Sequence, residues 1–363
     1  MAPGAPLHVS LVAVPGTLSM PVAGLYEVLN AFPVLASFYD DIPEVSPFQV
    51  EIVGAEQTTM AAASGLPITI QRAFRDVVST DIVIVPTMAV DQNWRPGRHP
   101  ELVEWLQAMH GTGTVLCSAC TGLVILAETG LLDGQRATTH WAIEPVVRAC
   151  FPEVELCLNE VLLTAGQQEE LVMSGGGASW QDLVLYLIGR FVSPGASRAM
   201  AKFEMLEQHA EGQAPYLPFL PPVQHGDSLI RAAQHWLETH FTDAGPVAGM
   251  AAIANLSPRS LERRFRRATG YSPIDYVQRV RIEEAKRRLE QTDAAIDQIG
   301  WDVGYQDPAA FRRLFKRIAR VTPGAYRRKF AVPDLGRNTT GYLSRPLYPK
   351  RSTGGRKSEQ PLE

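Results

Sequence analysis

The stretch TVLCSACTGLVILA, residues 114–127, decides the fold of the first half of the chain. A first apolar run, TVL, leads into the CSACTG segment, and a second apolar run, LVILA, follows it. This pattern predicts a β-strand that turns sharply into a helix, with Cys120 at the turn. Because α/β enzymes place a nucleophile at such a turn, the segment predicts either a cysteine hydrolase or a protein that keeps the architecture of one.

The residues on both sides of this segment alternate short β-rich runs with helical patterns. Strands are expected at 8–14, 48–53, 81–85 and 114–116, helices at 22–38, 101–109 and 180–191, and a later hairpin at 161–165 and 170–173. Alternation of this kind is typical of a parallel sheet that is covered on both faces. The sequence therefore predicts an α/β domain over residues 1–195.

The sequence changes character after residue 195. Residues 196–225 contain the proline-rich stretch APYLPFLPP and lack periodicity, which predicts a flexible interdomain linker. An entirely helical pattern follows over residues 226–330. The tail, residues 331–363, has scattered Gly, Ser, Lys and Arg and is expected to be disordered. A chain of 363 residues is long enough for the two domains that this division implies.

The composition is that of an ordinary globular protein, with 45% apolar and 20% charged residues. Four cysteines in a chain of this length do not form a disulfide framework, so a reducing cytoplasm is expected. No apolar stretch approaches the roughly 18 residues of a membrane span, so no membrane partner is expected. The net charge of -4 conceals an asymmetry, because residues 1–225 carry -14, residues 226–330 carry +7 and the tail carries +3. Only the basic part is expected to bind a polyanion.

The segment VAGMAAIANLSPRSLERRFRRATG, residues 247–270, has the features of a helix-turn-helix. Ser257 suits a helix N-cap, and Pro258 suits the first helical position. In the helix that follows, Leu261 and Phe265 are expected to face inward, while the arginines lie mostly outward.

The same pattern returns in residues 295–318, AIDQIGWDVGYQDPAAFRRLFKRI, with Asp307 and Pro308 at the cap and the first turn. Between the two units, residues 273–291 are expected to form one long amphipathic helix. Nineteen residues span roughly 28 Å, and major-groove segments on one face of DNA repeat every ~34 Å. The connecting helix could therefore place two recognition helices in successive grooves. The alternative is a helical bundle with solvated arginine-rich faces.

Residues 228–330 resemble the DNA-binding domain of AraC/XylS transcription factors. The resemblance is carried by LSPRSLERRFRRATGYSPIDYVQRVRIEEAKRRLEQT and IGWDVGYQDPAAFRRLFKRIARVTPGAYRRKF. It implies double-stranded promoter DNA as a partner, with RNA polymerase as a second candidate partner. It places base contacts at Arg259, Glu262, Arg263, Pro308, Ala309, Arg312 and Arg313, and the remaining exposed cations, Arg266, Arg267 and Lys316, on phosphates. Gly300 and Arg320 depart from the family pattern, which usually has alanine and glycine there, and this casts doubt on local stability.

The first 195 residues resemble the amidotransferase-like sensor domain of GlxA-type regulators, within the ThiJ/PfpI superfamily. The stretches that carry the resemblance are VAGLYEVLNAF (22–32), DIVIVPTM (81–88), CSACTGLVILAETGLLDGQRATTHW (117–141) and LVMSGGGASWQDLVLYLI (171–188). The resemblance implies a flavodoxin-like, class I amidotransferase-like fold and a homodimer formed through this domain. It places an effector pocket at Cys120, Thr121, His140, Trp141, Gly175 and Gly176.

Cys120 leaves two alternative functions open. Enzymes of the superfamily combine a cysteine at the turn with a histidine, here His140, and an acid from the first helix region. The acid position is occupied by Pro21, which cannot orient a base, so no catalytic residue is assigned. A cysteine hydrolase or amidase and a redox sensor, both using Cys120, remain as alternatives. No cofactor or metal site is expected, because Cys150 and Cys157 lack partners at ligand spacing.

Together these features predict a cytoplasmic, nucleoid-associated bacterial protein that regulates transcription. The basic domain is expected to bind specific DNA sequences, and a small-molecule effector is expected to control it from a non-catalytic sensor domain. A constitutive DNA-binding protein whose front domain only dimerises is a third alternative. No motif specifies the effector, the operator or the direction of regulation.

Overall fold

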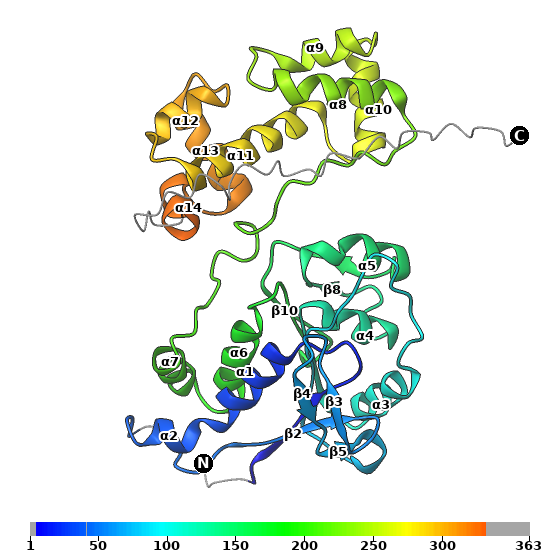
Figure 1. Cartoon of the computed structure of the whole chain (residues 1–363), viewed down its shortest axis with the longest axis vertical. Helices are drawn as coiled ribbons and strands as arrows, with labels where there is room; N and C mark the ends of the chain where they lie inside the picture. Colours follow the sequence, from blue (N-terminus) through cyan, green and yellow to red (C-terminus); the bar gives the residue numbers. More distant parts are fainter. Residues whose placement is uncertain (1–4, 41, 332–363) are drawn as a thin grey trace, which may run out of the picture.

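The computed structural model describes residues 5–40 and 42–331, which form two bodies joined by an extended segment (Figure 1). The expected disordered tail, residues 331–363, lies outside the described residues except for Ala331. Among the described helices, none is long and apolar enough to cross a membrane.

The first body is built on a seven-stranded sheet with the order β10-β11-β7-β6-β1-β2-β5. All neighbouring strands are parallel except β10, which pairs antiparallel with β11. The strands are β1 (Leu7–Val12), β2 (Phe48–Gly54), β5 (Arg72–Ala73), β6 (Ile82–Val85), β7 (Val115–Ala119), β10 (Leu162–Ala165) and β11 (Leu171–Ser174). Two small sheets flank it, formed by β3 (Thr59–Ala61) with β4 (Pro67–Thr69) and by β8 (Arg136–Ala137) with β9 (Glu155–Leu156). The predicted parallel α/β architecture and its closing hairpin are confirmed.

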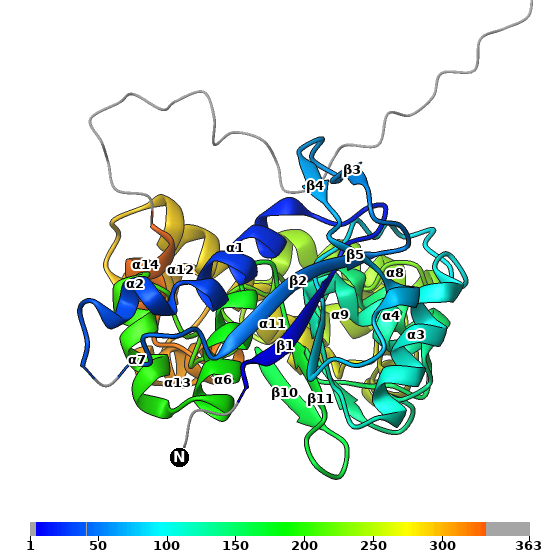
Figure 2. The same cartoon turned by 90° about the horizontal axis from the view of Figure 1, so that it is seen from below.

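Helices cover both faces of the sheet, and the strands bury side chains on each face. In β6, Ile82 and Ile84 pack on one core while Val83 and Val85 pack on the other. Because both faces are covered, the strand is a continuous apolar run rather than an alternating one. Figure 2 shows α1, α2, α6 and α7 on one side of the strands and α3 and α4 on the other. These helices, with α5, are α1 (Ser19–Asn30), α2 (Phe32–Ala36), α3 (Pro100–Gly111), α4 (Leu123–Glu128), α5 (Glu144–Cys150), α6 (Trp180–Phe191) and α7 (Pro194–Phe203).

Two boundaries differ from the sequence-based expectation. The single helix expected over 22–38 is two helices, α1 and α2, and Pro33 lies in the first turn of α2. Proline lacks an N–H and clashes with the carbonyl four residues earlier, so α1 cannot continue through it. The expected domain boundary at residue 195 falls inside α7. The Ser193 side chain caps this helix at the amide of Ala196, and Met200 is fully buried in the core of the first body.

The second body consists of seven helices among the described residues. They are α8 (Ser228–His240), α9 (Pro246–Ile253), α10 (Pro258–Thr269), α11 (Pro273–Gln291), α12 (Ile296–Asp302), α13 (Pro308–Ala319) and α14 (Pro323–Phe330). The long helix α11 joins two separate cores. Tyr276 and Val277 pack with α8, α9 and α10, whereas Ile282, Ala285 and Leu289 pack with α12, α13 and α14. The prediction of two helix-turn-helix units on one connecting helix is confirmed.

The two recognition helices begin alike and end differently. At α10 the Ser257 hydroxyl accepts a hydrogen bond from the Ser260 amide, and at α13 the Asp307 carboxylate accepts one from the Ala309 amide. Both helices end on a residue with left-handed backbone, which is Gly270 (φ 78°) after α10 but Arg320 (φ 61°) after α13. At Arg320 the chain therefore has a residue with a side chain where the left-handed backbone conformation favours glycine.

Replacing Arg320 with glycine is expected to stabilise the protein by about 0.5–1 kcal/mol. The left-handed conformation costs a non-glycine residue roughly 1–2 kcal/mol, and the greater freedom of glycine in the unfolded chain offsets part of that gain. Urea denaturation of the full chain measures the change. The reciprocal change, Gly270→Arg, should destabilise it by a similar amount. An Arg320→Gly variant that is less stable than the parent would mean that the arginine side chain makes a stabilising contact that outweighs its backbone strain.

Candidate DNA-binding face and sensor cavity

One face of each recognition helix is basic and exposed, while the opposite face is buried. On α10, Leu261 and Phe265 are fully buried, and on α13, Phe311 and Phe315 are fully buried. Of the ten residues expected to contact DNA, nine are exposed, and they are Arg259, Glu262, Arg263, Arg266, Arg267, Ala309, Arg312, Arg313 and Lys316. The tenth, Pro308, is half-buried. The four-residue spacing of the two buried apolar side chains on each helix fixes this orientation.

Acidic neighbours hold some of these cations in place. Arg266 pairs with Glu262 one turn away at 3.2 Å, and Arg312 pairs with Asp297 of α12 at 2.6 Å. Arg313 lies 3.6 Å from the capping carboxylate of Asp307. These exposed pairs contribute little to stability. They can orient the guanidinium groups before DNA arrives, and DNA phosphates can replace the carboxylates.

Arg281 of α11, which was not among the expected functional residues, connects the two helix-turn-helix units. Its guanidinium donates to the carbonyl oxygens of Phe241 (2.6 Å), Asp243 (2.9 Å) and Gly304 (3.0 Å). The first two follow α8 in the first unit, and Gly304 is the turn glycine of the second unit. A Cβ at Gly304 would meet the guanidinium, so glycine is needed there for the close approach. No local sequence signal marks Arg281, because its partners lie far away in the chain.

The turn after β7 has the geometry of a nucleophile turn. Cys120 has a left-handed backbone (φ 57°), and a Cβ at Gly122 would collide with the backbone carbonyls of Val85 and Pro86 at the end of β6. The Thr121 hydroxyl accepts from the amide of Met88 (2.9 Å) and donates to its carbonyl (2.5 Å). The Thr139 hydroxyl donates to the Cys120 carbonyl (2.7 Å). The strained turn is thus fastened to two neighbouring segments.

The Cys120 side chain lies in an environment that favours the neutral thiol. It is 2% exposed, and burial raises the pKa of its thiol, which hydrogen bonds from its neighbours only partly offset. Burial also raises the pKa of Cys117. The His140 Nδ1 accepts a hydrogen bond from the Ala142 amide at 3.1 Å, and burial lowers the pKa of this imidazole. At neutral pH the pair is therefore a neutral thiol and a neutral imidazole, whereas an activated cysteine is a thiolate.

Iodoacetamide is expected to label Cys120 at pH 7 at least roughly tenfold more slowly than the half-buried Cys157, because only an accessible thiolate reacts. The raised pKa also predicts that the rate at Cys120 keeps rising through pH 9. Peptide mass spectrometry resolves the two sites, and Cys120→Ser identifies the adduct. Equal rates at pH 7 would indicate an activated thiolate and favour the hydrolase or redox alternatives.

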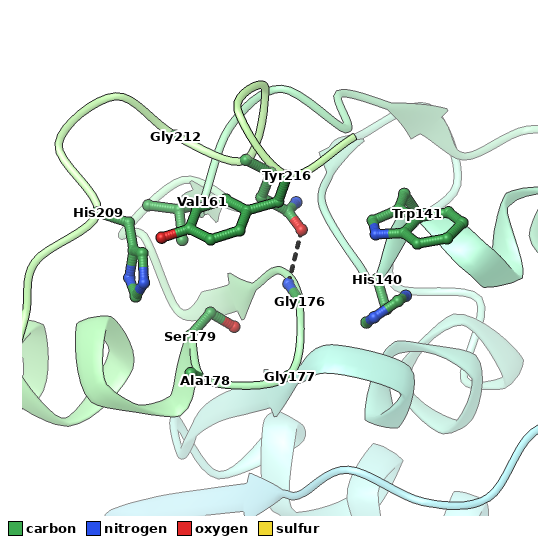
Figure 3. Close-up of a pocket in the computed structure, with 11 residues that line it drawn as sticks. His140, Trp141, Val161, Gly176, Gly177, Ala178, Ser179, His209, Gly212 and Tyr216 are labelled. Atoms are coloured by element: carbon green, nitrogen blue, oxygen red, sulfur yellow. Dashed lines mark hydrogen bonds between the residues drawn. The ribbon is translucent and has the colours of Figure 1, made fainter. Parts of the chain in front are cut away.

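A cavity of about 360 Å³ opens at the carboxyl end of the sheet, close to this turn. Figure 3 shows His140 and Trp141 on one side of it and His209 on the other. Its lining comprises His140, Trp141, Val161, Gly176, Gly177, Ala178, Ser179, His209, Gly212, Gln213 and Tyr216. Of the six residues expected in the effector pocket, His140, Trp141 and Gly176 line this cavity.

The other three expected pocket residues, Cys120, Thr121 and Gly175, are buried and are not part of the lining. For Gly175 the reason lies in residues 209–216, which belong to the segment expected to be a flexible linker. The Gln213 side chain is packed so closely on Gly175 that a Cβ there would collide with it. Residues of the expected linker thus fold back onto the first domain and form part of the cavity wall. Local sequence patterns do not show this, because the contacts join segments that are far apart in the chain.

Two polar features of the lining are suited to binding a ligand. The Ser179 hydroxyl, in a residue that is 3% exposed, has no hydrogen-bond partner among the described residues. A buried polar group without a partner is costly, and a ligand could supply the partner. His209 is held in place, because its Nδ1 lies 2.6 Å from Asp182 Oδ2 and its amide donates to Asp182 Oδ1 at 2.8 Å. Within residues 5–40 and 42–331, no group of three or more His, Cys, Asp or Glu side chains could hold a metal ion.

Known proteins resemble both halves of the chain. Residues 11–175 match the DJ-1/PfpI family, and residues 250–329 match a helix-turn-helix domain family. The HTH-type transcriptional regulator GlxA of Rhizobium meliloti is 28% identical over 233 residues, which cover 62% of this chain and 68% of the relative. CdhR and GbdR of Pseudomonas aeruginosa, both HTH-type transcriptional regulators, are 25% and 26% identical. Their matches cover 83% and 72% of this chain and 87% and 70% of the relatives.

The two matches lie in the same order as the two bodies of the structure, the sheet domain first and the helical domain second. The relatives named above extend across both bodies. This chain therefore joins a domain that matches the DJ-1/PfpI family to an AraC-type helix-turn-helix domain, and it is similar across both to HTH-type transcriptional regulators such as GlxA.

Proposed function

We propose that this protein is a sequence-specific DNA-binding regulator of transcription that responds to a small molecule bound in its sensor cavity. The observation that carries the DNA-binding part is the pair of capped recognition helices on α11, each with an exposed basic face. Arginine and lysine side chains on such faces contact phosphates and the base edges of the major groove. The family relationship supports the same conclusion.

The effector part of the proposal rests on the cavity and its unpartnered hydroxyl at Ser179. A volume of about 360 Å³ is within the range of small-molecule sites. The cavity lies at the carboxyl end of a parallel sheet, where open α/β sheets bind their ligands. We place the effector against His140, Trp141, Gly176 and Ser179.

The buried, protonated thiol of Cys120 supports a non-catalytic sensor domain. Pro21, at the position of the family's acid, supports the same conclusion. On this proposal the strained turn shapes the floor beneath the cavity rather than attacking a substrate. The protein would act at the bacterial nucleoid, as a homodimer on paired sites and together with RNA polymerase.

Selection of genomic fragments by the purified full-length protein at physiological salt tests the DNA-binding proposal. The expected result is enrichment of a few sites, each with two groups of specified bases about one helical turn apart. Binding that remains salt-sensitive and without sequence preference would contradict it. The genes beside the enriched sites would then nominate effectors for a binding assay with the cavity.

A further inference from the structure

Residues 209–219, here called the latch loop, contact both bodies of the protein. On the sensor side, the Gln213 side chain is 4% exposed although the residue begins a turn in the segment between the two bodies. Its Oε1 accepts from the Gly176 amide at 2.6 Å, and its backbone amide donates to the carbonyl of Asn159 at 2.9 Å. The dashed line in Figure 3 marks the bond to Gly176. A glutamine from the loop is thus inserted into the sensor domain beside the cavity.

The group that receives Gln213 is an acceptor cage of four oxygens. The Gln213 Nε2 donates hydrogen bonds to these oxygens: it lies 3.0 Å from the Thr138 hydroxyl and the Glu160 carbonyl, and 3.1 Å from the carbonyls of Thr139 and Leu158. A carboxamide has only two N–H groups, so each is shared between acceptors. A carboxylate would face four acceptors with no proton to donate. An ammonium would leave the Gly176 amide without an acceptor, so the cage with Gly176 matches a primary carboxamide.

On the other side, the latch loop is bound to the DNA-binding domain. The Tyr216 ring meets the Phe330 ring edge-on at 5.2 Å, and the Lys329 ammonium lies 4.9 Å from its centre. The buried Lys286 ammonium of α11 donates to the Leu217 carbonyl at 2.7 Å. Phe219 packs edge-on against Tyr276 at 5.2 Å. Four residues after Gln213, the chain is therefore already anchored to α11.

The sensor segment that holds Gln213 also lies near the recognition helices. Asn159, which accepts from the Gln213 amide, shares a cavity of about 470 Å³ with Arg266, Arg317 and Arg320. Arg266 is in the last turn of α10, and Arg317 is in the last turn of α13. The insertion of Gln213 thereby fixes how the sensor domain faces both recognition helices.

We propose that Gln213 is an intramolecular ligand of the sensor domain, and that an effector with a primary carboxamide takes its place in the acceptor cage and releases the latch loop. This inference rests on the proposed effector role of the cavity. The loop stays bound to α11 and α14 when Gln213 leaves, so the sensor and DNA-binding domains lose their fixed orientation. A ligand in the adjoining cavity lies next to the cage, and its affinity for the released state drives the shift.

Hydrogen exchange of the full-length protein, read by mass spectrometry, tests this proposal with two variants. Gln213→Ala empties the cage, and Gly175→Ala expels Gln213 by a methyl group placed against it. In both variants the Gly176 amide and the latch loop should exchange roughly tenfold faster or more, because a buried hydrogen bond is lost. The matched control is Gln208→Ala, an exposed glutamine of the same segment, which should leave exchange unchanged.

Small probes distinguish a carboxamide site from a general polar site. In Gln213→Ala, propionamide should restore protection of the Gly176 amide while the latch loop stays exposed to exchange. Propionamide should not restore it in Gly175→Ala, whose methyl group fills the space. In the parent protein, a high concentration of propionamide should accelerate exchange of the loop, since it competes with a tethered group at high effective concentration.

Two results would overturn the proposal. One is unchanged exchange at Gly176 and in the latch loop in both variants, which would mean that Gln213 does not hold the loop. The other is equal or better protection by propionate or propylamine than by propionamide, which would mean that the cage does not select a carboxamide. Because no DNA is present in these measurements, neither result bears on whether the protein binds DNA.

Discussion

Replacing Arg263 with alanine is expected to weaken binding to the specific site by about 1–3 kcal/mol, or roughly 5- to 150-fold, and to relax base preference at one position. Arg263 is exposed on α10 and forms no ion pair with a carboxylate of the described residues, so its guanidinium can bind guanine O6 and N7 directly. Titration of selected fragments with each base substituted in turn measures both effects.

Lys316 on α13 provides the contrast to Arg263. Its single ammonium is expected to contact a phosphate, so Lys316→Ala should weaken binding to all sequences alike. The slope of the logarithm of the binding constant against the logarithm of the salt concentration should become shallower by about one, because one fewer counterion is released. Arg198→Ala removes an exposed cation from α7 of the sensor domain and serves as the control with no effect on DNA. If Arg263→Ala left base preference intact, the assignment of base contacts to the first recognition helix would be wrong.

Replacing Arg281 with alanine is expected to destabilise the DNA-binding domain by about 2–3 kcal/mol. Three carbonyl groups lose a charged donor at once, and hydrogen bonds to charged groups contribute more than neutral ones. The cation–π contact of Arg281 with Tyr305, at 5.2 Å, is lost as well. Hydrogen exchange of α8–α14 in the full chain measures the loss of stability.

The same variant should also lose the coupling between the two recognition helices, because Arg281 ties the end of α8 to the turn at Gly304. Footprinting should then show one protected half-site at protein concentrations where the parent protects both. Arg287→Ala is the matched control, since among the described residues that guanidinium donates hydrogen bonds only to Glu284 and Gln291 on its own helix and should contribute about 0.5 kcal/mol or less. Equal losses in the two variants would show that Arg281 has no special connecting role.

The local elements of both domains could be predicted because short-range chemistry specifies them. Ser257 with Pro258 and Asp307 with Pro308 mark the starts of the recognition helices through capping bonds within three residues. The apolar runs at β6 and β7 mark buried strands because both faces of the sheet are covered. The errors lie at two prolines. Pro33 is in the first turn of α2 and divides what was expected to be one helix over 22–38, and Pro194 begins α7, which runs through the expected domain boundary at residue 195.

The candidate site was only partly predictable, because only some of its residues lie in segments that local sequence patterns identify. His140, Trp141 and Gly176 follow sheet strands in a familiar pattern, and the structure places them at the cavity. Ser179, His209, Gln213 and Tyr216 carry no such pattern. Three of these four lie in a proline-rich stretch whose composition resembles that of a flexible connector, yet their partners are far away in the chain: Thr138 is 75 residues from Gln213, and Phe330 is 114 residues from Tyr216.

The sequence by itself determined an α/β domain followed by two helix-turn-helix units on a connecting helix, with basic residues on the outward faces. Helical period, strand composition and capping residues are local properties, so they can be read without knowing the fold. Only the tertiary structure decided that Cys120 is buried, that Arg281 joins the two units, and that the Gln213 side chain is inserted into the first domain. Each of these depends on backbone carbonyls and amides from distant segments, and every residue has such groups, so the sequence cannot specify which of them will meet.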